Sequence, residues 1–408
     1  MQSRNVAIAR TPNMRLVRRQ LIHASYALLA LCVIVCPTTK ATPTPILNTS
    51  VLVLRLAAGA TSGSGILSTL YWDEIDVPNA YNVRQQIYGT GPNNECTLAA
   101  GTSTYWIYDH DGFPSNSADG RLALTICFPE APGSIATLGD FYVTDYGKTI
   151  AMLSWTGVVT FTPKLLYIDA GGERLANSGV HQVATVNGTT FYVAGTAAYD
   201  YGFQYVPLDN PAYVEVVSGA IPGQPGYFDS RAVAIYNGQL YGVDSTLDSG
   251  WGGIFKLGAG MPVATASTAA TLLPGFTGTA SLWTIVFQST VSVWAATDGI
   301  AGALGGVVGY TWNAGTSSWS QTVTKAFDIS HGMYSITGRD EAGHYVLYGC
   351  TASILYRWDT TLIADPAATI YDVTTAAPGG SLRGVVIAPM SPTPSPTTTS
   401  TATSTASL

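Results

Sequence analysis

Five polar or cationic residues recur after residue 180 at nearly equal spacing. They are His181, Arg231, Ser281, His331 and Arg383, which lie 50, 50, 50 and 52 residues apart. Arginine binds planar anions through paired hydrogen bonds, and histidine is a donor whose charge switches near neutral pH. Brought together in one ring, these residues predict a binding site for a carboxylate, a sulfate or a sugar acid. The alternative is that they are only the solvated polar ends of repeated elements.

Other chemistry-bearing motifs are weaker. Asp109, His110 and Asp111 offer carboxylates to calcium, but the remaining spacing of a calcium loop is missing. A second acidic run, residues 72–76, is expected at a strand end or turn, with solvated side chains as the default. The sequence contains no Gly-x-Ser-x-Gly nucleophile motif and nothing that pairs two carboxylates for glycoside hydrolysis. We therefore predict no catalytic residue, no metal and no cofactor.

Each of the five recurring residues opens a segment rich in apolar and β-branched residues, which is typical of a strand. Asn-Gly turns at 187–188 and 237–238 favour hairpins after the first two segments. Second, third and shorter fourth strands are expected to follow in each repeat. The four complete repeats place their strands at 181–186, 191–194, 202–205 and 213–217; 231–236, 240–243, 253–256 and 271–273; 281–286, 291–294, 306–309 and 319–323; and 331–336, 345–348, 353–356 and 369–373. Four short strands per fifty residues describe a blade of a β-propeller.

The two ends of the domain complement each other. Residues 383–388 form a lone first strand, whereas segments 51–54, 67–72 and 82–87 look like strands two to four. Pairing of the C-terminal strand with this N-terminal blade would close the ring and remove exposed strand edges. Residues 89–180 fit one blade with an insertion or two blades. We predict an all-β propeller over 51–390 with six four-stranded antiparallel blades, and seven blades as the alternative.

Two phrases of the repeat carry a family resemblance. Residues 236–243 (YNGQLYGV) and 186–193 (VNGTTFYV) resemble the repeats of NHL-like and related secreted propellers. The likeness is good over 180–390 and loose over 51–180. It implies a six-bladed propeller but says little about activity, because propellers host unrelated functions.

The N-terminus has the pattern of an export signal. Basic residues at 14–19 precede an apolar run at 26–36 and small residues around 39–41, so residues 1–41 are predicted as a signal peptide or signal anchor. A buried core helix is the alternative. A Thr/Pro linker is expected at 42–50, and a Ser/Thr/Pro-rich low-complexity tail at 391–408. Glycosylation sequons at Asn48 and Asn187 agree with a secreted or cell-surface protein.

Net charge limits the classes of partner, and the cysteine content limits the possible disulfides. Six of the 18 basic residues lie before residue 42, which leaves 12 basic against 25 acidic residues and a net charge of −13. This balance argues against nucleic acid as a partner. Beyond the signal segment, Cys96, Cys127 and Cys350 allow at most one intrachain disulfide. Proximity favours the pair Cys96–Cys127, and three buried thiols are the alternative.

Three functions fit these observations. We favour a non-catalytic binding module, secreted or at the cell surface, for a glycan, a peptide or an anionic small ligand. The alternatives are a calcium-dependent hydrolase or lactonase-like enzyme and a structural component of a cell wall or matrix. Contact with a membrane is expected only through the N-terminal segment, if that segment stays uncleaved.

Overall fold

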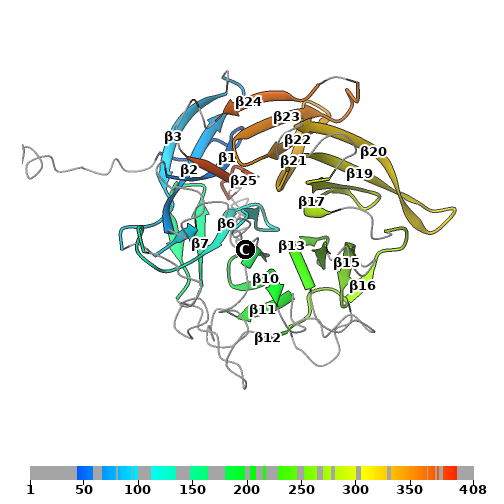
Figure 1. Cartoon of the computed structure of the whole chain (residues 1–408), viewed down its shortest axis with the longest axis horizontal. Coiled ribbons are helices and arrows are strands. Elements are labelled where there is room, and N and C mark those ends of the chain that lie inside the picture. The colour runs from blue at the N-terminus through cyan, green and yellow to red at the C-terminus, as the bar shows by residue number, and fades with distance from the viewer. Residues whose placement is uncertain are drawn as a thin grey trace, which may run out of the picture. The chain divides into compact units, whose positions relative to one another are not determined.

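The computed structural model describes residues 44–57, 67–79, 81–93, 95–99, 112–134, 148–163, 180–197, 203–207, 215–216, 228–245, 252–263, 270–276, 281–299, 305–328, 332–364, 366–372, 375 and 380–392. All of them belong to one unit of the chain, Pro43–Leu408. The described strands of this unit form six antiparallel blades around a central channel (Figure 1). The predicted signal segment, 1–41, lies outside the described residues, as does the tail beyond residue 392.

Each blade has four strands, which follow one another from the channel outward. Blade 1 is β25 (Ser381–Ile387), β1 (Val51–Leu56), β2 (Leu67–Asp76) and β3 (Asn82–Tyr88). Blade 2 is β5 (Ser115–Asn116), β6 (Leu122–Cys127), β7 (Thr149–Ser154) and β8 (Val159–Phe161). Blade 3 is β9 (Val180–Thr185), β10 (Thr190–Ala197), β11 (Phe203–Pro207) and β12 (Glu215–Val216).

The second half of the ring follows the same order. Blade 4 is β13 (Phe228–Tyr236), β14 (Gln239–Asp244), β15 (Gly253–Leu257) and β16 (Ala270–Leu272). Blade 5 is β17 (Leu282–Ser289), β18 (Ser292–Thr297), β19 (Gly305–Asn313) and β20 (Ser318–Asp328). Blade 6 is β21 (Ser335–Glu341), β22 (His344–Cys350), β23 (Ile354–Asp359) and β24 (Ala368–Asp372).

The predicted closure of the ring is confirmed. Strand β25 pairs antiparallel with β1, so that Val51 lies opposite Ile387 and Leu56 lies opposite Ser381. The last strand of the domain therefore supplies the inner strand of the first blade. This pairing gives β1 a partner on both sides and ties the two ends of the domain together.

The described residues also settle the blade count that the sequence left between six and seven. The short strand β4 (Thr97–Ala99) pairs with β2 and does not start another blade. Residues 112–163 supply a single blade, β5 to β8. Blades 3 and 4 share one sheet, because the end of β10 pairs with the start of β13 at Thr196↔Asp229 and Ala197↔Phe228. Six blades are thus confirmed.

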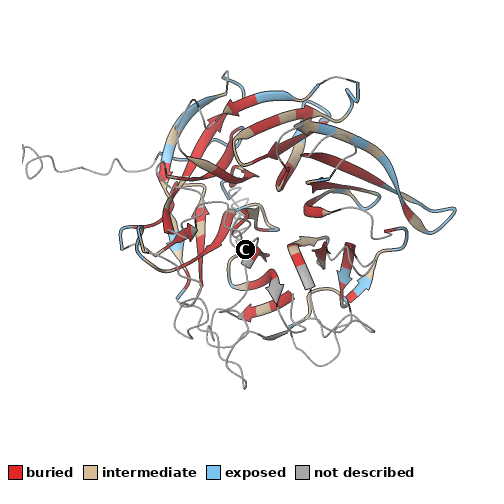
Figure 2. Cartoon of the chain, viewed as in Figure 1, coloured by how far each residue is buried: buried red, intermediate tan, exposed pale blue. Residues whose placement is uncertain are grey.

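Local sequence explains individual turns and one departure from the expected pattern. Asn237 and Gly238 have φ angles of 48° and 71°, as a tight hairpin turn between β13 and β14 requires. The fourth strand of blade 5 was expected to be short, but β20 has 11 residues. Its pairing with β19 continues outward to Trp312↔Trp319, where the two indoles meet at 5.8 Å and stabilise the extended hairpin. Figure 2 shows the exposed residues gathered on such outer strands and on turns.

A disulfide joins Cys96 to Cys127, with Cα atoms 5.2 Å apart. Both sulfurs are buried in the core between blades 1 and 2, and a backbone bridge between Thr97 and Phe128 lies beside them. The third cysteine of the domain, Cys350, is a buried free thiol. The pair preferred from its proximity in the sequence is therefore the one that the structure contains.

We expect the disulfide to contribute about 4 kcal/mol to the free energy of unfolding, from the chain entropy of a loop of about 30 residues. Thermal unfolding with and without reductant measures this contribution. Reduction should lower the melting temperature of the wild type and of the control Cys350→Ala, but not that of Cys96→Ala/Cys127→Ala. Equal melting of the wild type in both conditions would show that the bridge is absent or carries no stability.

Residues 44–50, expected as a Thr/Pro linker, pack against the blades. Ile46 belongs to the core between blades 1 and 2, and its N–H donates to the carbonyl of Trp155 at 2.7 Å. The Arg339 guanidinium of blade 6 donates to the carbonyls of Asn48, Thr49 and Ser50 at 3.2, 2.6 and 3.0 Å. This segment thus fastens the first blade to the last one.

Candidate functional site

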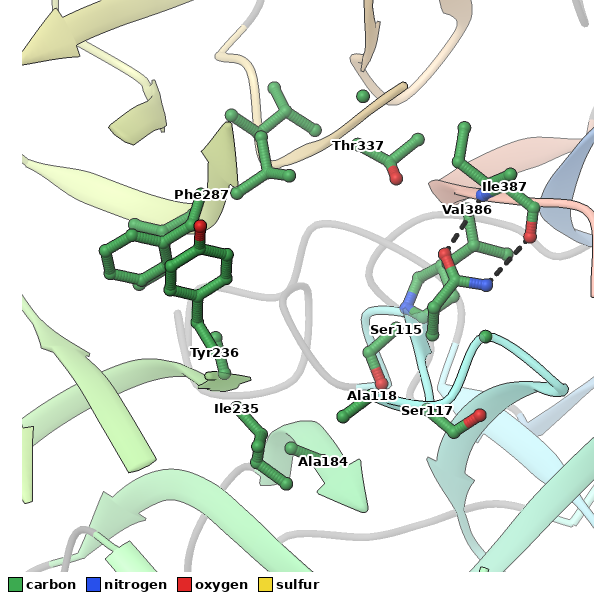
Figure 3. A pocket seen from close by; sticks show the side chains of 18 of the residues that line it. Ser115, Ser117, Ala118, Ala184, Ile235, Tyr236, Phe287, Thr337, Val386 and Ile387 are labelled. Carbon is green, nitrogen blue, oxygen red and sulfur yellow. Dashed lines mark hydrogen bonds between the residues drawn. The ribbon is translucent and has the colours of Figure 1, made fainter. Parts of the chain in front are cut away.

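The inner strands of all six blades line a pocket in the central channel (Figure 3). Its cavity volume is about 340 Å³, which lies in the range of small-molecule sites. The pocket opens where the inner strands end and the hairpin turns to the second strands begin. Part of its rim is formed by the turn residues Ala118 and Gly120 and by Ala388 and Met390, which follow the closing strand.

Apolar side chains make up most of the pocket wall. Each inner strand of blades 3 to 6 and the closing strand contributes at least one alanine, valine, isoleucine or phenylalanine. Tyr236 and Phe287 stack in this wall with ring centroids 4.8 Å apart and an interplanar angle of 13°. Tyr241 packs on Phe287 from β14, at 4.6 Å. The stack gives the pocket a flat aromatic surface.

Polar side chains of the inner strands tie neighbouring blades together. Nδ2 of Asn116 donates to the carbonyl of Ile387 at 2.8 Å, and the N–H of Ile387 donates back to Oδ1 at 3.1 Å (Figure 3). Nε2 of Gln182 donates to the carbonyl of Pro114 at 3.1 Å, and its Oε1 accepts the N–H of Val233 at 3.2 Å. These bonds hold the strands around the cavity in fixed positions.

Three such bonds identify equivalent positions of the inner strands. In each, a side chain accepts the N–H of the next inner strand along the chain or around the ring. The three pairs are Gln182 with Val233, Thr284 with Ile336, and Ser335 with Val385. Blade 6 contains both kinds of residue: Ser335 accepts and Ile336, directly after it, donates. On every inner strand the accepting position therefore lies one residue before the donating position. The residues that lie two positions before the donating position are His181, Arg231, Trp283, Tyr334 and Arg383.

The residues at this position form a ring around the channel, and in blades 5 and 6 they are not the residues that the fifty-residue spacing predicted. Trp283 and Tyr334 occupy the positions that the fifty-residue spacing assigned to Ser281 and His331. Ser281 precedes β17, and His331 lies outside the described residues. His181, Arg231 and Arg383 stand at equivalent positions, one layer below the pocket residues of their strands. None of the four described predicted residues lines the pocket, and their role in ligand binding stays a prediction.

Trp283 is the centre of this layer and is 1% exposed. Its ring meets those of Phe113, Tyr334 and His181 edge-on, with centroids 5.7, 4.9 and 6.4 Å away. The Arg231 guanidinium lies over the indole at 3.5 Å, a cation–π contact. The aromatic floor, as we call Phe113, His181, Trp283 and Tyr334, packs beneath the pocket.

Charge at the pocket is confined to its rim. Arg339 is the only charged side chain among the described lining residues. Besides its three carbonyl partners, it donates from Nε to Glu341 at 2.7 Å. Burial alone would raise the pKa of Glu341, but hydrogen bonds from Tyr348, Arg357 and Arg339 outweigh it and hold that pKa below its ordinary value. Arg339 thus shares with Arg357 a carboxylate that stays ionised near neutral pH, and its guanidinium is already engaged by protein acceptors.

The acidic run 72–76 has a structural role, and the expectation of solvated side chains there is wrong. Asp73 and Glu74 lie within β2 and are fully buried, because each has a cationic partner. Arg55 binds Asp73 at 2.6 Å, and Arg84 binds Glu74 at 2.7 Å. The calcium candidates at 109–111 lie outside the described residues. The described part of the chain contains no cluster of three potential metal ligands.

The two sequons differ in whether their hydroxyl residue is exposed or buried. Asn187 lies in the exposed turn after β9, where its Oδ1 accepts from Thr189 Oγ1 at 2.7 Å and from the Thr189 N–H at 3.2 Å. Asn48 is exposed, but Ser50 of the same sequon is fully buried and donates to Glu74 at 3.0 Å.

We therefore expect glycosylation at Asn187 to approach completion and glycosylation at Asn48 to stay lower in a eukaryotic secretory host, because docking of residues 44–50 withdraws Ser50. Site occupancy follows from peptide mass spectrometry after enzymatic glycan removal in heavy-oxygen water. Asn187→Gln and Asn48→Gln assign the two sites. Higher occupancy at Asn48 than at Asn187 would contradict this order.

One feature of the structure bears on export. The disulfide is a bond typical of proteins that leave the reducing cytosol. Within the described ranges no helix is long and apolar enough to cross a membrane.

Comparisons with known proteins give structural likeness only. No protein-family model matches the chain, and no curated protein sequence matches it. Among solved structures, a nidogen/laminin complex matches at 10% identity and a TM-score of 0.42, covering 82% of this chain and 97% of that one. The allergen Mala s 1 of Malassezia sympodialis matches at 10% identity and 0.42, covering 84% and 92%. A putative 6-phosphogluconolactonase of Bacteroides uniformis matches at 12% and 0.41, covering 79% and 82%. Such low TM-scores carry no argument about function.

Proposed function

We propose that the protein is an exported, non-catalytic binding module that holds a small ligand in the channel pocket. The pocket itself carries the proposal: one cavity, formed jointly by six inner strands, with mainly apolar walls and few convergent polar groups. The side-chain bonds between blades support it, since a wall fixed before binding lowers the entropy cost of holding a ligand. The aromatic floor gives the cavity a packed base.

The disulfide, the sequons and the N-terminal basic and apolar pattern support the exported location. An acidic, glycosylated surface would keep such a module soluble outside the cell.

Substitution Ala118→Trp tests the proposed site. Ala118 is an exposed turn residue at the mouth of the cavity, so an indole there should fill the opening without disturbing the core (Figure 3). We expect the neutral fluorescent probe N-phenyl-1-naphthylamine to bind the full-length wild type and to lose at least tenfold in affinity in the variant. Ala131→Trp, at an exposed turn residue outside the pocket lining, is the matched control.

Equal binding of the probe to Ala118→Trp and to the wild type would place its site elsewhere and reject the proposal. Absence of any probe binding to the folded wild type would reject it as well. Circular dichroism of each variant shows whether the fold is kept.

A further inference from the structure

We infer that the channel pocket selects a flat, neutral, mainly apolar molecule that carries a hydrogen-bond acceptor. This inference rests on the proposed function, because it specifies the ligand class of the same pocket. It departs from the anionic ligand that the recurring arginines and histidines suggested, because His181, Arg231 and Arg383 lie one layer below the pocket and do not line it.

The charge of the lining argues for a neutral ligand. Arg339 is the only cation among the described lining residues, and its guanidinium already binds Glu341 and the carbonyls of residues 48–50. An anion in the cavity would lose its hydration without gaining a cationic partner, which is strongly unfavourable. The acidic net charge of the domain acts in the same direction.

The wall argues for a flat molecule. Tyr236 and Phe287 are both partly exposed and stack nearly parallel in the wall, so they present an aromatic surface to the cavity. Tyr241 packs against Phe287 and fixes that ring. A planar apolar group can stack on this surface with little loss of side-chain freedom, because the rings are already held.

Two hydroxyls argue for a hydrogen-bond acceptor on the ligand. Most polar side chains of the lining already have partners: Ser115 bonds to the carbonyl of Val183, and Thr185 donates to the carbonyl of Thr190 at 2.6 Å. Among the described lining residues, the hydroxyls of Tyr236 and Thr337 have no partner within the protein. Tyr236 comes from blade 4 and Thr337 from blade 6, and Figure 3 shows them on different sides of the cavity. Each O–H is free to donate to a carbonyl or ether oxygen, worth about two- to tenfold in affinity.

A matched pair of probes tests the class. Methyl 2-naphthoate is neutral, and 2-naphthoate has the same ring with an ionised carboxylate at pH 7. Each is titrated against the full-length protein loaded with N-phenyl-1-naphthylamine, and displacement is followed by fluorescence. We expect the ester to displace the probe at least tenfold more tightly than the carboxylate.

Isosteric variants test the two hydroxyls. At least one of the variants Tyr236→Phe and Thr337→Val should weaken binding of the ester about two- to tenfold, and both should leave binding of the probe unaffected. Tyr241→Phe is the control, because Tyr241 supports the stack but does not line the pocket. All three keep the size of the side chain, and equal melting temperatures confirm that they are folded.

The outcomes separate the inference from the function on which it rests. If the carboxylate binds as tightly as the ester, the neutral class is wrong while the pocket remains a binding site. If the ester is preferred but neither hydroxyl variant weakens it, the assigned acceptor contact is wrong. If the fluorescent probe itself does not bind, the proposed function fails and the inference fails with it.

Discussion

Substitution of Trp283 by Ala should lower the free energy of unfolding by about 3–5 kcal/mol, the cost of truncating a fully buried tryptophan. Trp283 is 1% exposed and contacts Phe113, His181 and Tyr334, which come from three other blades. Arg231 loses its cation–π partner in the same variant. The truncation leaves an empty space in the middle of the ring of blades, and the surrounding strands have little freedom to collapse into that space. Denaturant unfolding of the full chain measures the loss.

Trp312→Ala is the matched control. Trp312 lies on the outer hairpin of blade 5, where it is half-buried and contacts Trp319. Its removal should cost clearly less than removal of Trp283, because part of its surface already faces water. If the two variants lose the same stability, then the aromatic floor is not the packed centre of the ring.

Substitution of Asp73 by Ala should also cost about 3–5 kcal/mol, since it leaves a buried cation without its partner. Arg55 binds both carboxylate oxygens of Asp73, at 2.6 and 3.2 Å, and is itself 4% exposed. Tyr371, from the outer strand of blade 6, donates to the same carboxylate at 2.9 Å. Burial and the neighbouring carboxylate of Asp73 raise the pKa of Tyr371, so that its hydroxyl remains a donor at neutral pH.

The double variant Arg55→Leu/Asp73→Leu separates pairing from packing. Replacing both charges by apolar side chains removes the unpaired cation, so much of the lost stability should return. Thermal or denaturant unfolding compares the double variant with Asp73→Ala. A double variant that is less stable than Asp73→Ala would show that the ion pair contributes more than the burial penalty it offsets.

Much of the fold follows from short-range patterns. Short apolar segments between turn residues predicted the strands. The Asn237-Gly238 pair is a strong hairpin signal because both residues tolerate the positive φ angles that they adopt in this turn. The missing partners of β25 and β1 at the two ends of the domain predicted their pairing. Unpaired strand edges are costly, so a lone first strand and a blade without one imply each other.

The register of the candidate site could not be predicted from spacing. A constant interval of 50 residues selected Ser281 and His331, whereas the hydrogen bonds between inner strands place Trp283 and Tyr334 at those positions. Connections between blades tolerate extra residues at little cost, so equal spacing along the chain does not ensure equal positions in the ring. Only the contacts between blades fix the register.

The pocket residues themselves carried no distinctive sequence signal. Tyr236 was an ordinary residue of the predicted strand 231–236, and Phe287 and Thr337 lay one position beyond the predicted strands 281–286 and 331–336. Their importance comes from facing one cavity from three different blades. The acidic residues Asp73 and Glu74 were misjudged for the related reason that their partners, Arg55 and Arg84, come from neighbouring strands. In both cases the decisive information is which strands meet in space.

A crystal structure of the full-length protein with N-phenyl-1-naphthylamine bound tests the central claim most directly. We predict density for the naphthyl ring in the channel, on the surface formed by Tyr236 and Phe287 and within reach of Thr337. Density for the probe at any other surface, with the channel free of it, would contradict the assignment of the pocket as the binding site.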